Sequence, residues 1–187
     1  MNYQEMKLSK LQNKLLQSEQ YSPAEDTYFF ADHLKKEVGQ TALDIGTGSG
    51  YLAEILSDSF SQVIATDISF ESLNSQNPKV KNGICCDAVE ALRTKFDLIV
   101  CNLPYLPSEK ISDRTIDGGK EGLEISQKII KSAKNCLNEG GKLLFLTSSL
   151  ANYQKLIEYT KGLGFNVRII DKKKLFFEKL ILVEARM

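Results

Sequence analysis

A glycine-rich turn after an apolar segment is the clearest sign of chemistry in this chain. Residues 43–50 read Leu-Asp-Ile-Gly-Thr-Gly-Ser-Gly. Glycines in such a turn let the backbone bend sharply and approach a bound ligand closely. The spacing of Gly46, Gly48 and Gly50 is G-x-G-x-G, which differs from the G-x-G-x-x-G of dehydrogenases. Asp44 stands just before these glycines, where a carboxylate would repel a dinucleotide pyrophosphate but would suit a cationic ligand.

Two more aspartates follow apolar segments farther along the chain. Asp67 ends the segment 62–67, and Asp87 follows the segment 82–86. S-adenosylmethionine fits this set, because it carries a cationic sulfonium and a cationic amino group but no phosphate. We expect Asp67 to accept the ribose hydroxyls, Asp87 to meet the adenine amino group and the amide of Ala88 to reach a ring nitrogen. Any one aspartate could be a helix N-cap, but three in phase after successive strands favour a cofactor site.

The elements that must position these residues are short apolar segments that alternate with helical patterns. Such alternation predicts an α/β fold with a doubly wound, Rossmann-like, mostly parallel sheet that helices cover on both faces. We expect strands at 41–45, 62–67, 82–86, 96–101, 141–147, 165–171 and 175–185. We expect helices at 3–18, 24–37, 50–58, 69–76, 88–92, 123–138 and 150–162. Only a short polar turn joins the last two strands, so they should be antiparallel, since a parallel return needs a crossover.

Size and composition favour one domain and argue against several classes of function. We expect a single domain over 1–187, with 1–37 forming N-terminal helices that pack on the catalytic core. The 24 acidic and 24 basic residues balance, which disfavours a stand-alone binder of nucleic acid. One histidine (His33) and four cysteines without a C-x-x-C pair predict no metal site. Because the sequence contains neither an apolar membrane span nor a signal peptide, we expect a cytoplasmic protein.

The tetrapeptide Asn102-Leu103-Pro104-Tyr105 follows the expected strand 96–101. It resembles the N-P-P-Y motif of class I S-adenosylmethionine-dependent methyltransferases, which methylate planar nitrogens of glutamine amides, adenine or cytosine. Such a nitrogen is a poor nucleophile because its lone pair is delocalised, so it needs acceptors for both N–H bonds. The resemblance implies that the Asn102 side-chain oxygen and the Leu103 carbonyl are these acceptors, that Tyr105 packs against the planar group, and that Asn102 also borders the cofactor. Leu103 departs from the usual proline, but Pro104 still favours an extended residue before it.

Membership of this class implies a seven-stranded sheet in the order 3-2-1-4-5-7-6, with an antiparallel last strand. Residues 22–27, Ser-Pro-Ala-Glu-Asp-Thr, resemble the P-x-E-D-T stretch of HemK/PrmC-type release-factor glutamine methyltransferases, whose threonine (Thr27 here) borders the cofactor. Residues 117–124 resemble the G-G-x-D-G-L-E stretch of that family, with Glu121 in place of the aspartate. Because the glycine loop comes so early, the chain resembles the short archaeal and eukaryotic branch. That branch implies the Gly-Gly-Gln glutamine of a class I translation release factor as substrate, and in many members a small zinc-binding activator subunit.

Two other functions remain open at this point. The tetrapeptide does not distinguish an amide from adenine, so the alternative is an adenine N6-methyltransferase that acts on DNA or RNA. A non-catalytic S-adenosylmethionine-binding partner protein is a third hypothesis. In the implied strand order, the strand at 82–86 lies at the edge of the sheet and contains neither charge nor proline. We expect either the activator or the N-terminal helices to cover it. We further expect 106–120 to form a mobile loop on the substrate side.

Overall fold

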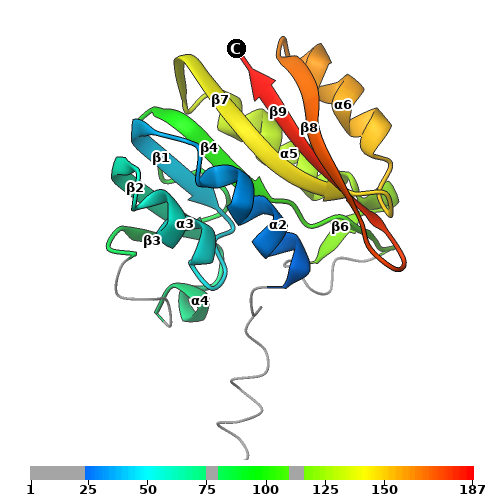
Figure 1. Cartoon of the computed structure of the whole chain (residues 1–187), viewed down its shortest axis with the longest axis horizontal. Coiled ribbons are helices and arrows are strands. Elements are labelled where there is room, and N and C mark those ends of the chain that lie inside the picture. The colour runs from blue at the N-terminus through cyan, green and yellow to red at the C-terminus, as the bar shows by residue number, and fades with distance from the viewer. Residues whose placement is uncertain (1–23, 75–79, 110–115) are drawn as a thin grey trace, which may run out of the picture.

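The computed structural model describes residues 24–74, 80–109 and 116–187, which form a seven-stranded sheet flanked by helices (Figure 1). The spatial order of its strands is β3-β2-β1-β4-β7-β9-β8. Their bounds are Gly39–Ile45 (β1), Phe60–Asp67 (β2), Gly83–Cys85 (β3), Phe96–Asn102 (β4), Leu137–Ser148 (β7), Asn166–Lys174 (β8) and Lys179–Arg186 (β9). Strand β9 is antiparallel to both of its neighbours. If these seven strands are numbered along the chain, the order is 3-2-1-4-5-7-6, which confirms the implied topology.

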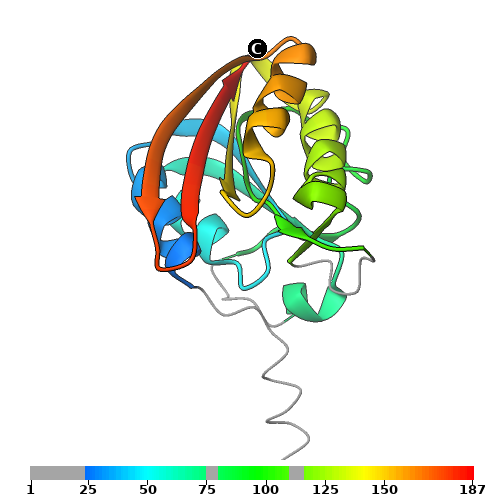
Figure 2. The same cartoon turned by 90° about the vertical axis from the view of Figure 1, so that its right-hand side faces the viewer.

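Helices pack on both faces of this sheet and close two apolar cores. Their bounds are Glu25–Leu34 (α2), Tyr51–Leu56 (α3), Phe70–Asn74 (α4), Glu124–Lys134 (α5) and Tyr153–Gly162 (α6). Successive strand residues point to opposite faces. In β4, Leu98 and Val100 therefore join the core under α2 and α3, whereas Ile99 and Cys101 join the core under α5 and α6 (Figure 2). None of the described helices is long and apolar enough to cross a membrane.

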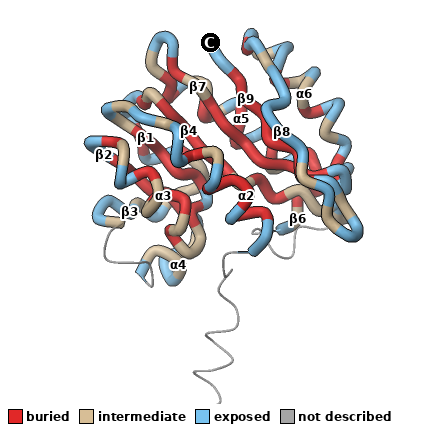
Figure 3. Tube along the Cα trace, viewed as in Figure 1, coloured by how far each residue is buried: buried red, intermediate tan, exposed pale blue. Residues whose placement is uncertain are grey.

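Burial differs sharply between the middle of the sheet and its edge strand β8 (Figure 3). Strand β9 is buried over most of its length, while β8 is mostly exposed. Helix α2 anchors the N-terminal part of the described chain, because Phe30 and Leu34 are fully buried in the core beneath it. The helix expected at 3–18 lies outside the described residues.

The helix expected at 88–92 is wrong. This segment forms two successive tight turns, in which Glu90 N donates to Asp87 O and Leu92 N donates to Val89 O. Ala88 has a φ of 49°, a left-handed conformation that an α-helix does not contain. The apolar side chains that suggested a helix, Val89 and Leu92, are instead buried in the core under α5.

The loop expected at 106–120 is ordered at both ends. Leu106–Pro107 (β5) pairs in parallel with Asp117–Gly119 (β6), and a 3-10 turn at Lys120–Gly122 leads into α5. Residues 110–115 lie outside the described residues, so the expectation of a mobile loop stays a prediction there.

Candidate active site

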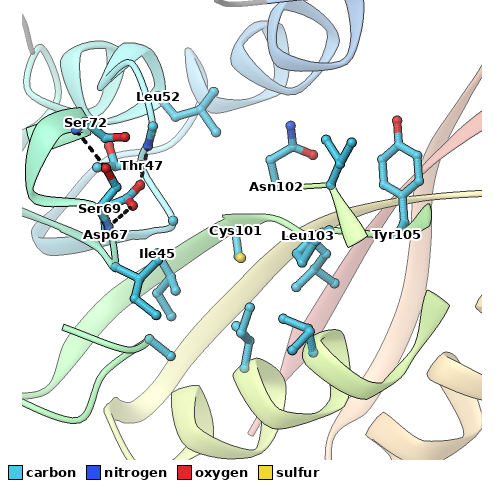
Figure 4. A pocket seen from close by; sticks show the side chains of 18 of the residues that line it. Ile45, Thr47, Leu52, Asp67, Ser69, Ser72, Cys101, Asn102, Leu103 and Tyr105 are labelled. Carbon is cyan, nitrogen blue, oxygen red and sulfur yellow. Dashed lines mark hydrogen bonds between the residues drawn. The ribbon is translucent and has the colours of Figure 1, made fainter. Parts of the chain in front are cut away.

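One cavity of about 340 Å³ opens at the carboxyl ends of β1, β2 and β4. Ligands of doubly wound sheets bind at this edge, where helices leave neighbouring strands toward opposite faces. Most of the expected site residues line the cavity, namely Thr27, Gly46, Gly48, Asp67, Asp87, Ala88, Asn102, Leu103, Pro104 and Tyr105. Figure 4 shows the Asp67 side of the cavity facing the Asn102 and Tyr105 side. The topology thus joins the two groups of residues that the sequence singled out separately.

The glycine loop has the backbone that its sequence predicted. Gly46, Gly48 and Gly50 have φ values of 67°, 51° and 80°, which glycine adopts without steric cost. A Cβ at Gly46 would meet no atom within 4 Å, so the main chain here faces open space. Gly50 does not line the cavity; it immediately precedes α3.

Asp44 lies beneath the glycine loop and is absent from the cavity wall. Its Oδ2 accepts hydrogen bonds from Thr47 Oγ1 (2.7 Å) and from the amide of Ala53 (3.1 Å). These bonds tie the loop to the first turn of α3. The side chain is almost fully buried, and burial raises the pKa of Asp44 to about 7. The sequence suggested that Asp44 faces a cationic ligand. Asp44 does not line the cavity, however, and it supports the glycine loop from below.

Asp67 is placed to bind a ligand and also holds the loop. Its Oδ2 accepts from the amide of Gly48 at 2.8 Å, and its Oδ1 accepts from the amide of Ser69 at 2.8 Å. A carboxylate has about four acceptor positions, so each oxygen keeps capacity for a further donor. Because Asp67 also lines the cavity, it can accept hydroxyl groups from inside it.

The far end of the cavity carries an ion pair that the sequence did not reveal. Lys128 Nζ, from α5, lies 2.6 Å from Asp87 Oδ2 and also lines the cavity. The neighbouring wall is apolar and includes Ile68, Ile125 and Ile129. This end combines a flat apolar wall with a carboxylate, which suits a purine ring bearing an amino group.

The opposite end presents the tetrapeptide 102–105, which begins at the last residue of β4. Asn102 Nδ2 donates to Asp26 Oδ2 at 3.1 Å, and Asp26 Oδ1 accepts from the amide of Thr27 at 2.6 Å. A carboxylate only accepts, so it selects the NH₂ end of the Asn102 amide and orients the carbonyl end away from itself. The signal for Asp26 in the sequence is its place in the stretch 22–27 that resembles P-x-E-D-T.

The leucine in this tetrapeptide has its own structural role. The amide of Leu103 donates to Leu146 O at 3.1 Å, and proline could not make this bond. The Leu103 side chain is buried in the core under α5. Leucine therefore anchors the segment through a backbone hydrogen bond and side-chain packing.

The glycines of the 117–124 stretch are needed for contact with the tetrapeptide. A Cβ on Gly118 would lie 2.7 Å from Pro104 O, and one on Gly122 would lie 2.3 Å from Tyr105 O. Ser126 Oγ donates to Pro104 O at 3.1 Å from the first turn of α5. Two glycines and a serine thus hold the tetrapeptide backbone against this stretch.

Comparison with known proteins agrees with this geometry. Residues 23–177 match the methyltransferase small domain family. The chain belongs to this family. It is therefore a methyltransferase.

Several relatives of this methyltransferase have related names. A Methanocaldococcus jannaschii protein, named as a protein N5-glutamine methyltransferase, is 33% identical over 91% of this chain and 93% of its own length. Methyltransferase HEMK2 of Mus musculus is 26% identical over 77% of this chain and 78% of its own length. The release factor glutamine methyltransferase of Rhodopirellula baltica is 29% identical, and the match spans 49% of that protein. The Mtq2–Trm112 complex of E. cuniculi, described as methylating the termination factor eRF1, contains a chain with a TM-score of 0.78 and 25% identity, covering 89% of this chain and 97% of its own.

The buried Asp44 makes the stability of this methyltransferase depend on pH. The pKa of Asp44 rises from 3.8 to about 7 on folding, so the folded protein binds more protons than the unfolded chain between these values. Its contribution is therefore complete below pH 3.8 and is lost as the pH rises through about 7. Urea unfolding should show that Asp44→Asn, which keeps an acceptor for Thr47 and Ala53, loses less stability than the wild type between pH 5 and pH 8. The difference should be a few kcal/mol at most, since one pKa unit corresponds to about 1.4 kcal/mol; equal slopes for both proteins would contradict the buried carboxyl as its source.

Proposed function

We propose that this methyltransferase transfers the methyl group of S-adenosylmethionine to the side-chain amide nitrogen of a glutamine in a translation release factor. The observation that carries the proposal is the Asn102 amide, oriented by Asp26 in the wall of the cavity. The name of the Methanocaldococcus jannaschii relative supports a protein glutamine as acceptor, and the Rhodopirellula baltica relative and the E. cuniculi complex support a release factor as the protein. Such a substrate also agrees with the expected cytoplasmic location.

The groups that line the cavity support S-adenosylmethionine as the cofactor. The open backbone at Gly46 accommodates the amino acid portion, Asp67 accepts the ribose hydroxyls, and Asp87 with Ala88 meets the adenine edge. Thr27 borders the same space from α2. When bound, S-adenosylmethionine supplies an activated methyl group on its sulfonium.

The residues after β4 bind and orient the acceptor amide. The Oδ1 atom of Asn102 is buried and accepts one N–H of the substrate, while the Leu103 carbonyl accepts the other. These two bonds fix the plane of the amide and increase electron density on its nitrogen, and the Tyr105 ring covers the flat face. The apolar neighbours Ile116 and Leu106 reduce the access of water to this end of the cavity. No strong base is needed before attack, because the nitrogen attacks as a neutral amide and its surplus proton passes to solvent after the N–C bond has formed.

Methyl transfer to purified protein tests this function. The methyltransferase is incubated with radiolabelled S-adenosylmethionine and a class I release factor, and in parallel with the same factor carrying Gln→Asn in its Gly-Gly-Gln motif. An adenine-bearing oligonucleotide is the third substrate. Label on the first protein alone supports the proposal. Label on the oligonucleotide alone would support the adenine alternative, and cofactor binding without transfer to any substrate would support the non-catalytic hypothesis.

A small zinc-binding activator subunit is the proposed partner of the β3 edge. Strand β3 pairs only with β2 among the described strands and contains neither charge nor proline. Beside it lies a shallow hollow lined mainly by Phe70, Leu73 and Val80, with Lys81 as its one charged residue, and Phe70 is 67% exposed. The opposite edge strand, β8, carries lysines and a register shift. Such features normally prevent a free edge strand from pairing with another chain. The difference between the two edges favours strand addition at β3.

Cys85→Lys should break this complex and leave the isolated methyltransferase folded. Cys85 is exposed, whereas Ile84 packs partly on the core and is a less suitable test position. Ile170→Lys on β8 is the matched control, because it adds the same charge to the opposite edge. Size-exclusion chromatography with the activator should show a complex for the wild type and for Ile170→Lys only. An intact complex with Cys85→Lys would place the docking surface elsewhere.

A further inference from the structure

Two phenylalanines at the turn between β8 and β9 are exposed to an unusual degree. Phe176 and Phe177 are 90% and 85% exposed. Their rings meet edge to face, with the ring centroids 4.5 Å apart. Adjacent exposed apolar side chains of this size often mark an interaction site. Aromatic residues are also enriched among the residues that dominate binding at interfaces.

Neither the turn nor the core requires aromatic residues at these positions. The amide of Leu175 donates to Glu178 O at 2.8 Å, so Phe176 and Phe177 are the two central residues of a tight turn. Gly, Asn, Asp and Pro favour such positions for conformational reasons, and phenylalanine offers none of these advantages. Burial does not explain these two residues either. The phenylalanines that stabilise this fold, such as Phe30 and Phe145, are completely buried.

The residues on either side hold the turn in place at the rim of the cavity. Leu175 packs against the core under α2 and α3, and Glu178 bonds to Ser148 Oγ. Glu178 also lines the cavity, so the exposed pair directly adjoins the methyl-transfer site in sequence. The end of β8 that leads into the turn lies beside α2, the helix that carries Asp26: Lys173 Nζ lies 3.8 Å from Glu25 Oε1 of that helix.

The charge around the pair points to the kind of surface it meets. Lys172, Lys174 and Lys179 flank the turn and are exposed. A cavity of about 340 Å³ is too small to enclose a protein, so the parts of a protein substrate beyond its glutamine must lie on the rim. An apolar patch bordered by acidic side chains on that substrate would complement both the rings and the lysines.

We propose that Phe176 and Phe177 form a docking surface for the methyl-accepting protein, next to the cavity that receives its glutamine. This inference rests on the proposed function. The pair contacts an apolar patch with an acidic border on the substrate protein, and it contributes to binding of the intact protein without entering the chemical step.

Steady-state kinetics with two substrates test this docking surface. The double variant Phe176→Ala/Phe177→Ala should raise the KM for the intact release factor by about 10- to 30-fold, the effect of removing a dominant interface contact. The kcat at saturation, and transfer to a short Gly-Gly-Gln peptide that cannot reach the turn, should stay within twofold of the wild type. Val38→Ala is the matched control, because Val38 is 77% exposed and precedes β1 at the end of that strand remote from the cavity. Lys174→Glu should also raise the KM for the protein, and most strongly at low salt.

The outcomes separate this inference from the function on which it rests. If the wild type does not methylate the release factor, the proposed function fails. If the wild type methylates it and the double variant has an unchanged KM, the docking surface is wrong and the proposed function stands. If the peptide and the intact protein lose activity equally, the pair supports the active site instead of docking, which also overturns the inference.

Discussion

Asn102→Ala should lower kcat by about 10² to 10³-fold, the loss that follows removal of one oriented polar group at a transition state. In the proposed mechanism Asn102 accepts an N–H of the acceptor amide, and this bond matters most when the nitrogen attacks. The affinity for S-adenosylhomocysteine should stay within a few-fold of the wild type, because the proposed cofactor contacts of Asp67 and Asp87 lie elsewhere on the cavity wall. Single-turnover methyl transfer and calorimetry measure the two effects separately.

Asp26→Asn is the companion variant and should cause a smaller loss of kcat. Asn102 remains, but it exchanges an ionised acceptor at 3.1 Å for a neutral one, so its amide is held less firmly. An Asn102→Ala enzyme with near-normal kcat would remove Asn102 from the mechanism. An Asp26→Asn enzyme as impaired as Asn102→Ala would mean that Asp26 itself contacts the substrate.

Asp67→Ala should weaken S-adenosylhomocysteine binding by about 10- to 150-fold for each charged hydrogen bond lost, since such bonds contribute about 1.5–3 kcal/mol. The loss should be at the upper end, because Asp67 also accepts from the amides of Gly48 and Ser69 and so shapes the loop. Asp67→Asn should bind with intermediate affinity, as it keeps one acceptor oxygen. Titration calorimetry is the measurement.

Thermal unfolding provides the control for Asp67. If Asp67→Ala melts near the wild-type temperature and still binds S-adenosylhomocysteine normally, the ribose lies elsewhere in the cavity. If the affinity falls while kcat at saturating cofactor is kept, the role of Asp67 is confined to binding. That pattern would distinguish it from Asn102, whose loss should appear in kcat.

Local patterns were enough to predict much of the fold. The apolar segments before Gly46 and Asn102 form β1 and β4, and their polar ends meet at one edge of the sheet. This succeeds because buried parallel strands are continuous apolar segments and because glycine spacing reports the backbone directly. The helix expected at 88–92 was wrong because a short apolar segment does not specify its own conformation. Burial of Val89 and Leu92 in the core decided the conformation instead.

By itself, the sequence determined the fold class, the loop that faces the cofactor and the tetrapeptide at the acceptor end, since each is encoded by residues close together in the chain. Tertiary structure alone decided which side chains meet. Asp26 and Asn102 are 76 residues apart, yet they share a hydrogen bond because α2 packs beside β4. Likewise, Asp44 supports the loop from below while Asp67 faces the cavity, although both lie at the carboxyl ends of strands. The physical reason is that contacts between distant segments depend on how helices pack across the sheet, and no local pattern of residues records that packing.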